Sequence, residues 1–161
     1  MSLDAYVRCR CIQEHRAKPH PFPKLLIVDP LEGPQLREEA TDDQWEAHDE
    51  WLADACEHQG FAAEEFIGNV WLVEKIRNCL QKLQDVSRRT FPMLLEKVIY
   101  DGTHTGDLIE ALDVPMLLTE VEAAEKLASR CGEDAPRLRE FLKKMHRLGM
   151  ASLAARNPIQ F

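Results

Sequence analysis

Near its N-terminus the sequence reads LDAYVRCRCI (residues 3–12), in which apolar and polar side chains alternate. Leu3, Ala5 and Val7 share one side of an extended chain with Cys9 and Cys11, while acidic, aromatic and basic residues occupy the other side. A period of two is typical of a half-buried strand. The pattern therefore predicts a strand over residues 3–12.

The segments that follow continue a predicted N-terminal sheet. Three prolines remove amide donors from residues 13–24, which predicts an extended connection. Residues 25–29 form a short apolar run that Pro and Gly close, and we expect a second strand there, paired with the first. The tail, residues 157–161, is extended by its Pro and fits an added edge strand.

Helices dominate the rest of the chain, as capping residues and apolar spacing indicate. The predicted helical segments are residues 42–59, residues 70–86, a turn beginning at Thr90, residues 114–130 and a last helix from Asp134. Residues 61–67 alternate well enough to be a third strand, although a helix stays open. Residues 101–106 have the composition of a turn-rich loop.

The predicted fold is therefore α+β, with a small, mainly antiparallel sheet packed against about five helices. The chain has 161 residues, enough for one domain to bury roughly 70% of its unfolded surface. We expect a single domain over residues 1–161.

Composition narrows the classes of protein. No run approaches the ~18 apolar residues of a membrane span. The net charge of −8 disfavours binding to a nucleic-acid backbone. Five scattered cysteines do not have the density of a disulfide-stapled secreted domain, and the expected location is the cytoplasm. The common nucleotide-binding, zinc-protease and serine-hydrolase motifs are absent from the sequence.

Three segments carry a resemblance: residues 3–11, the Pro-His-Pro-Phe-Pro run ending at Pro23, and the closing Asn-Pro-Ile-Gln-Phe161. They are similar to uncharacterised bacterial conserved hypothetical proteins. The resemblance implies a bacterial source and brings no activity, cofactor or catalytic residue with it.

Charge is distributed unevenly along the chain. Residues 38–74, here called the acidic block, contain twelve carboxylates, all three tryptophans and no Lys or Arg. Taking that −12 from the net −8 leaves +4 for the rest of the chain. Such a block is typical either of a solvated or internally paired surface, or of a face that binds a basic partner.

The helix predicted over residues 42–59 carries most of these acids. Its predicted buried stripe is Trp45, His48, Leu52, Ala55 and Cys56, with Trp51 at the margin. Acids in its last turn lie at the negative end of the helix dipole, where their charge is unfavourable. Selection for stability alone does not explain their presence there. The candidate partner-binding residues are Glu46, Asp49, Glu50, Trp51, Asp54 and Glu57. The resulting hypothesis is a bacterial cytosolic interaction protein without a cofactor, immunity-like or antitoxin-like, that occupies a basic protein surface.

A metal or thiol enzyme is the alternative hypothesis. Cys9 and Cys11, with His15 and His20, are ligand types that suit zinc, and a Cys/His pair can act as a nucleophile. On a strand, however, both sulfurs would share the apolar face, which favours core cysteines. The pair Cys56 and His58 is a further possibility that a continuous helix would split. We therefore assign no metal ligand from the sequence.

His104 lies between two threonines in the predicted loop. Turn chemistry explains this composition, although active-site loops look similar.

Overall fold

The computed structural model describes residues 2–29, 31–99 and 107–161. Its elements in chain order are β1 (Ser2–Arg8), β2 (Leu26–Asp29), β3 (Gly33–Leu36), α1 (Asp42–Asp54), β4 (Phe61–Asn69), α2 (Val70–Ser87), η1 (Met93–Val98), β5 (Leu108–Ile109), α3 (Val114–Leu127), η3 (Ala128–Asp134), α4 (Ala135–Ala155) and β6 (Ile159–Gln160). The fold is α+β with a small antiparallel sheet, as predicted. The described residues form four α-helices rather than about five, because the turn after Thr90 is the short π-helix η1.

The chain divides into two compact units. One, the inserted unit, comprises Arg8–Ala62, and the other, the main unit, comprises Met1–Val7 with Ala63–Phe161. The prediction of a single domain over residues 1–161 stays a prediction. The predicted loop at residues 101–106, with His104, lies outside the described residues.

The main unit contains a four-stranded sheet in the order β4-β1-β6-β5. The tail strand β6 runs antiparallel to both of its neighbours, with Gln160 opposite Tyr6 and Ile159 opposite Ile109. The tail is thus a strand, but its predicted edge position is wrong. Pairing on both sides satisfies more of its backbone than an edge would.

The first strand keeps its predicted alternation but not its predicted length or partner. Leu3, Ala5 and Val7 are buried, whereas the structure ends β1 at Arg8 rather than at residue 12. Its predicted pairing with residues 25–29 is wrong.

That second segment, β2, forms a separate hairpin with β3 in the inserted unit. The Asp29 carboxylate accepts hydrogen bonds from the amides of Leu31 and Glu32 and so holds the turn. Closing a short hairpin costs less chain entropy than a distant pairing.

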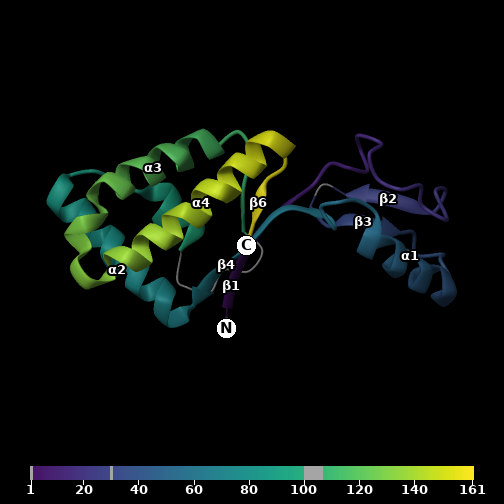
Figure 1. Ribbon diagram of the computed structural model, residues 1–161, viewed down its shortest axis with the longest axis horizontal. Helices are drawn as coiled ribbons and strands as arrows, with labels where there is room; N and C mark the ends of the chain where they lie inside the picture. The colour runs from purple at the N-terminus through teal and green to yellow at the C-terminus, as the bar shows by residue number, and fades with distance from the viewer. Residues whose placement is uncertain (1, 30, 100–106) are drawn as a thin grey trace. The chain divides into compact units, whose positions relative to one another are not determined.

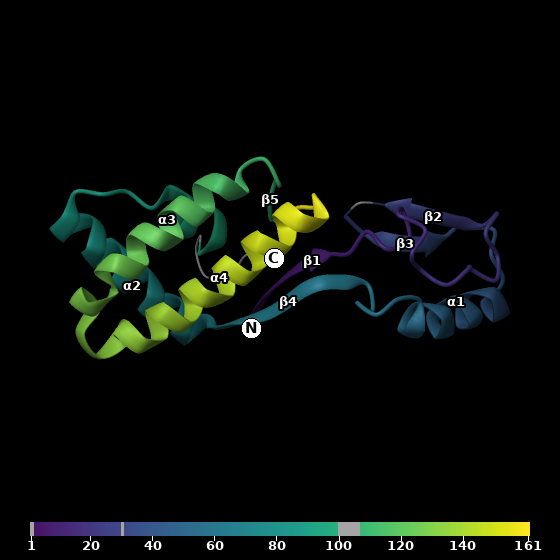
Figure 2. The ribbon, with the colours of Figure 1, turned by 45° about the horizontal axis from the view of Figure 1, so that its top comes forward.

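Three helices form the core of the main unit. Figures 1 and 2 both show α2, α3 and α4 packed side by side. The apolar row predicted for the last helix is confirmed, because all five of its members are buried: Leu138, Phe141, Leu142, Met145 and Leu148. Residues 61–67 belong to strand β4, which decides between the two predictions for that segment.

The helix of the acidic block is shorter than predicted and differently oriented. Helix α1 ends at Asp54, not at residue 59. Its buried residues are His48 and Trp51, whereas Trp45, expected in the buried stripe, is exposed. The buried side is therefore rotated by about 60° about the helix axis, at 100° per residue.

One buried carboxylate stabilises the main unit from within. The two oxygens of Glu120, on α3, accept hydrogen bonds from the backbone amides of Met93 and Leu94, each at 3.0 Å. Burial raises the pKa of Glu120, and the two amides only partly oppose this rise. Glu120 thus satisfies amides at the start of η1 that have no helical partner.

We expect Glu120→Ala to lower the free energy of unfolding by about 1–3 kcal/mol, because it leaves two buried amides unsatisfied. Urea denaturation of the full chain measures this loss. Glu122→Ala, at an exposed position on the same helix, is the matched control and should change stability by less than about 0.5 kcal/mol. Equal losses in the two variants would contradict a capping role for Glu120.

Candidate metal centre

Four metal-binding side chains converge in the inserted unit. The ligand atoms of Cys9, Cys11, Cys56 and His58 all lie within 4.8 Å of one another. The Cys9 and Cys56 sulfurs are 3.7 Å apart, and the Cys11 sulfur lies 3.2 Å from Nδ1 of His58. We call these four residues the Cys3His cluster.

The first pair of ligands lies in a turn directly after β1. The Cys9 amide donates to the carbonyl of Gly60, which joins the two ends of the inserted unit. Beyond it, the Cys11 carbonyl accepts hydrogen bonds from the amides of Arg16 and Ala17. This compact turn, rather than a continued strand, places Cys11 in the interior, where it is 1% exposed.

The second pair lies in a turn directly after α1. The Ala55 carbonyl accepts a hydrogen bond from the Lys18 amide, just beyond the helix end. In the turn itself the Gln59 amide donates to the Cys56 carbonyl, and Gly60 has a φ of +90°, which favours glycine. Because the chain is no longer helical at residues 56–58, both side chains can face the first pair.

The backbone around Cys56 favours negative charge on its sulfur. Burial opposes ionisation of Cys56, but the amides of Gly60 and His58 and the neighbouring thiols outweigh it, so the pKa of Cys56 is lowered. Burial also raises the pKa of Cys9, and burial together with the other two thiols raises that of Cys11 to about 12. Negative charge on one of the three sulfurs thus disfavours ionisation of the other two. A bound cation would remove this repulsion and allow all three thiols to ionise.

The donor set fits zinc. Three thiolates and one imidazole are the ligands of structural Cys3His zinc sites. Sulfurs bound tetrahedrally at about 2.3 Å from zinc lie about 3.8 Å apart, and the Cys9 and Cys56 sulfurs are separated by 3.7 Å. The identity and number of the ligands, and the distance between the Cys9 and Cys56 sulfurs, therefore agree with a tetrahedral zinc site.

The sequence singled out half of this cluster and paired it with the wrong histidines. His15 is exposed, and His20 is buried against other residues, so neither joins Cys9 and Cys11 in the cluster. The interpretation of these thiols as plain core cysteines rested on a strand to residue 12, and the dismissal of Cys56 and His58 rested on a helix to residue 59. The available signal was a Cys-x-Cys and a Cys-x-His, which lie just beyond the ends that the structure gives to β1 and α1.

The remaining two cysteines belong to the main unit. Cys79 and Cys131 are buried, and the Cys131 thiol lies 3.8 Å from the Cys79 carbonyl. Burial raises the pKa of Cys79 to about 12. These thiols pack as small apolar groups.

A buried pair of histidines, His20 and His48, joins the proline-rich segment to α1 in the inserted unit. Nδ1 of His20 accepts the amide of Phe22, so the other ring nitrogen, Nε2, carries the proton and donates to Nδ1 of His48 at 3.0 Å. The Trp51 ring packs edge-on against His20, and its Nε1 donates to the carbonyl of Lys18. Together these contacts fasten the proline-rich segment to α1.

The predicted partner-binding residues fall into three groups. Trp51 is 8% exposed, so its predicted role as a surface anchor is wrong, and its ring is used inside the unit. Asp54 pairs with Lys18 at 2.5 Å, and Glu57 lies 3.9 Å from Arg16. The other three are exposed acids without an ion pair among the described residues: Glu46, Asp49 and Glu50.

The acidic block does not belong to one unit. Helix α1 and its flanks lie in the inserted unit, whereas Glu64, Glu65 and Glu74 lie in the main unit. Glu65 pairs with Arg147 and Glu74 with Arg77. Most of the block's charge without an ion pair among the described residues thus lies on α1 and its flanks, with Glu64 in the main unit as a further exposed acid.

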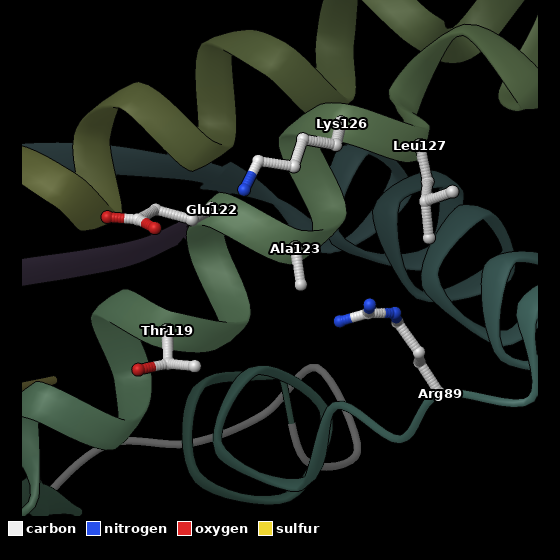
Figure 3. A pocket seen from close by; sticks show the side chains of 6 residues that line it. All are labelled: Arg89, Thr119, Glu122, Ala123, Lys126 and Leu127. Carbon is white, nitrogen blue, oxygen red and sulfur yellow. The ribbon is translucent and has the colours of Figure 1, made fainter.

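The main unit has a hollow of about 200 Å³ between α3 and the segment after α2. Figure 3 shows the Arg89 side chain reaching toward Ala123 and Leu127. Glu122 and Lys126 line the same hollow with opposite charges. A hollow with mixed charge and no buried polar group of its own does not select a ligand.

We expect the histidine pair to make the inserted unit acid-sensitive. Burial, and the proximity of His48, lower the pKa of His20 below its unfolded value of about 6.5. The unfolded chain therefore binds more protons, and the stabilisation is complete above about pH 6.5 and is lost as the pH falls below that value. Thermal unfolding between pH 7.5 and about 5.5, with the metal content measured at each pH, tests this expectation.

The control compares slopes rather than absolute stabilities. His20→Leu should flatten the loss of stability with falling pH, whereas His146→Leu, at an exposed position on α4, should leave the slope unchanged. The same slope in His20→Leu as in the wild type would refute the assignment to His20.

Comparisons with known proteins add no further assignment. The chain was compared with family models, with curated proteins and with solved structures, and none of them matches. Across the described ranges no helix is both long enough and apolar enough to span a membrane. The candidate site is therefore defined by its own geometry.

Proposed function

We propose that the chain is a zinc-binding, non-enzymatic interaction protein. The observation that carries the proposal is the convergence of four ligand atoms within 4.8 Å, from the Cys9–Cys11 turn and the Cys56–His58 turn. Zinc holds the inserted unit together, and that unit presents the acidic side of α1 to a basic protein partner.

The zinc is structural rather than catalytic. Catalytic zinc sites keep one position open for water or substrate, whereas structural sites fill all four positions with protein ligands. Three sulfurs and one imidazole nitrogen already supply four donors. An enzyme built on Cys9, Cys11, His15 and His20 has less support, because the two histidines lie outside the cluster.

The inserted unit has reason to need a metal. It is a small unit, and small units bury too little apolar surface to be stable by packing alone. Helix α1 has no basic residue in its last turn and acids along its length, so its own sequence favours it weakly. A zinc ion would join the two ends of the unit, and its binding free energy would become folding free energy.

The acidic side of α1 lies opposite its buried side. At 100° per residue, Asp42, Glu46 and Asp49 project away from His48 and Trp51. Trp45, 37% exposed, flanks these acids and replaces Trp51 as the aromatic side chain available to a partner. Charge of one sign speeds encounter with an oppositely charged surface, as expected for an immunity-like or antitoxin-like bacterial protein in the cytoplasm.

Elemental analysis of the purified chain tests the zinc site. We expect about one zinc per chain, which Cys9→Ser combined with Cys56→Ser abolishes, because two of four ligands are removed. Cobalt substitution should give the visible absorption of a tetrahedral thiolate site. Cys131→Ser, which alters a buried thiol outside the cluster, should keep its zinc. A wild-type chain that neither contains nor takes up zinc, or a double variant that retains it, would refute the site.

The acidic side of α1 is tested with a partner captured from the source organism and then purified. Reversing Glu46 and Asp49 to Lys should weaken binding by about tenfold or more and reduce its salt dependence, because both charges face the partner. Glu122→Lys on α3 is the matched control. Zinc content should be the same in the wild type, in the variant with Glu46 and Asp49 reversed and in the Glu122→Lys control. A failure of the interface proposal is therefore distinguishable from a failure of the zinc proposal. Salt-insensitive binding would contradict an electrostatic interface.

A further inference from the structure

The main unit exposes a group of apolar side chains at the start of α2. Phe66, Val70 and Trp71 are 53%, 49% and 56% exposed. Exposed large side chains are ordinary when they are scattered, but a contiguous group marks a binding surface more often. These three residues follow one another within six positions of the chain, where β4 leads into α2.

Next to them is a cavity of about 280 Å³ with an apolar floor. Ile67, Ile76 and Phe141 contribute buried side chains to its lining. The walls include Arg137 and Lys144 from α4. We call this cavity, together with Phe66 and Trp71, the aromatic groove.

Two cations that line the cavity also contact the Trp71 and Phe66 rings. The Arg137 guanidinium lies 5.2 Å from the centre of the Trp71 ring, and Lys144 Nζ lies 5.9 Å from the centre of the Phe66 ring. Lys75 adds a second cation over Trp71, at 5.8 Å. Each ring therefore forms part of a mixed aromatic and cationic rim.

Positive charge prevails at this rim. Among the described residues neither Lys75 nor Lys144 takes part in an ion pair, although Arg137 pairs with Asp134 and Glu140 is one acid in the lining. The first turn of α2 contains no acid, so the positive end of its dipole is not neutralised there by a side chain. An approaching carboxylate would meet three cations and the helix end together.

We propose that the aromatic groove binds an acidic segment of a partner protein that carries one large apolar side chain. The apolar side chain enters the cavity, next to Phe66 and Trp71, and its flanking carboxylates face Lys75, Arg137 and Lys144. At about 280 Å³ the cavity is at the small end of the range of ligand pockets, roughly 300–1,000 Å³, and has room for one large side chain. Aromatic residues and Arg are also the side chains that dominate binding energy at protein interfaces.

Nucleic acid is the competing occupant, since bases stack on aromatic rings beside cations. Among the residues that the structure describes, three cations surround this groove and Glu140 lies among them, which is little for neutralising a phosphate backbone. The charge arrangement therefore favours a protein segment.

The test uses a defined probe and the full, metal-loaded chain. A fluorescein-labelled synthetic peptide with a central Trp-Leu pair flanked by Asp and Glu should bind, as measured by fluorescence anisotropy. Two matched peptides replace either the acids by Lys or the Trp-Leu pair by Ala-Ala, and each should bind at least about tenfold more weakly. Equal binding of the acidic and the basic peptide would overturn the proposal.

Variants then locate the binding site. Trp71→Ala and Lys144→Glu should each weaken binding of the acidic peptide by about tenfold or more. Leu112→Ala and Lys82→Glu, at exposed positions outside the groove, should leave it unchanged. Thermal unfolding confirms that all four variants are folded. Full affinity in Trp71→Ala, or tighter binding of a labelled single-stranded oligonucleotide than of the acidic peptide, would overturn the assignment.

Discussion

The inserted unit depends on two short turns that meet. Residues 9–11 leave the sheet and residues 56–58 leave α1, and a single backbone hydrogen bond from Cys9 to Gly60 aligns them. Everything between them, including the hairpin, the proline-rich segment and α1, is a loop whose ends must be held together. Chain entropy opposes that closure, and a metal ion shared by both turns would offset it more effectively than the few side chains between them can.

Charge and burial divide α1 into two sides with different tasks. On the inner side the His20 and His48 rings bond each other and the Trp51 indole donates to the Lys18 carbonyl, so the unit gains polar contacts without exposing them. On the outer side the acids repel one another with little relief inside the molecule. That repulsion weakens the helix, and the contacts on the inner side have to compensate for it. The long proline-rich connection is therefore part of the structure of α1 rather than a spacer.

The sequence predicted well wherever a pattern was local and repeated. The alternation of Leu3, Ala5 and Val7 and the five-residue row of α4 are each set by the period of a single element, and both are buried as expected. Predictions from the sequence were wrong where a contact joined segments that are distant in the chain. One neighbour of β1, strand β6, lies far along the chain, and no local pattern specifies that pairing. The cluster was missed because two element ends were placed a few residues too far along, and element ends are the positions that propensity decides least.

The interior position of β6 affects the order in which the chain can fold during synthesis. Strand β1 is synthesised long before its neighbour at Ile159 and Gln160. Strand β1 can pair early with β4, but its other edge stays unpaired until β6 has been synthesised. The inserted unit, Arg8–Ala62, has no such delay, because all four residues of its cluster have emerged long before the tail. Metal binding would therefore let the inserted unit fold early, while β1 still lacks β6 as its second neighbour.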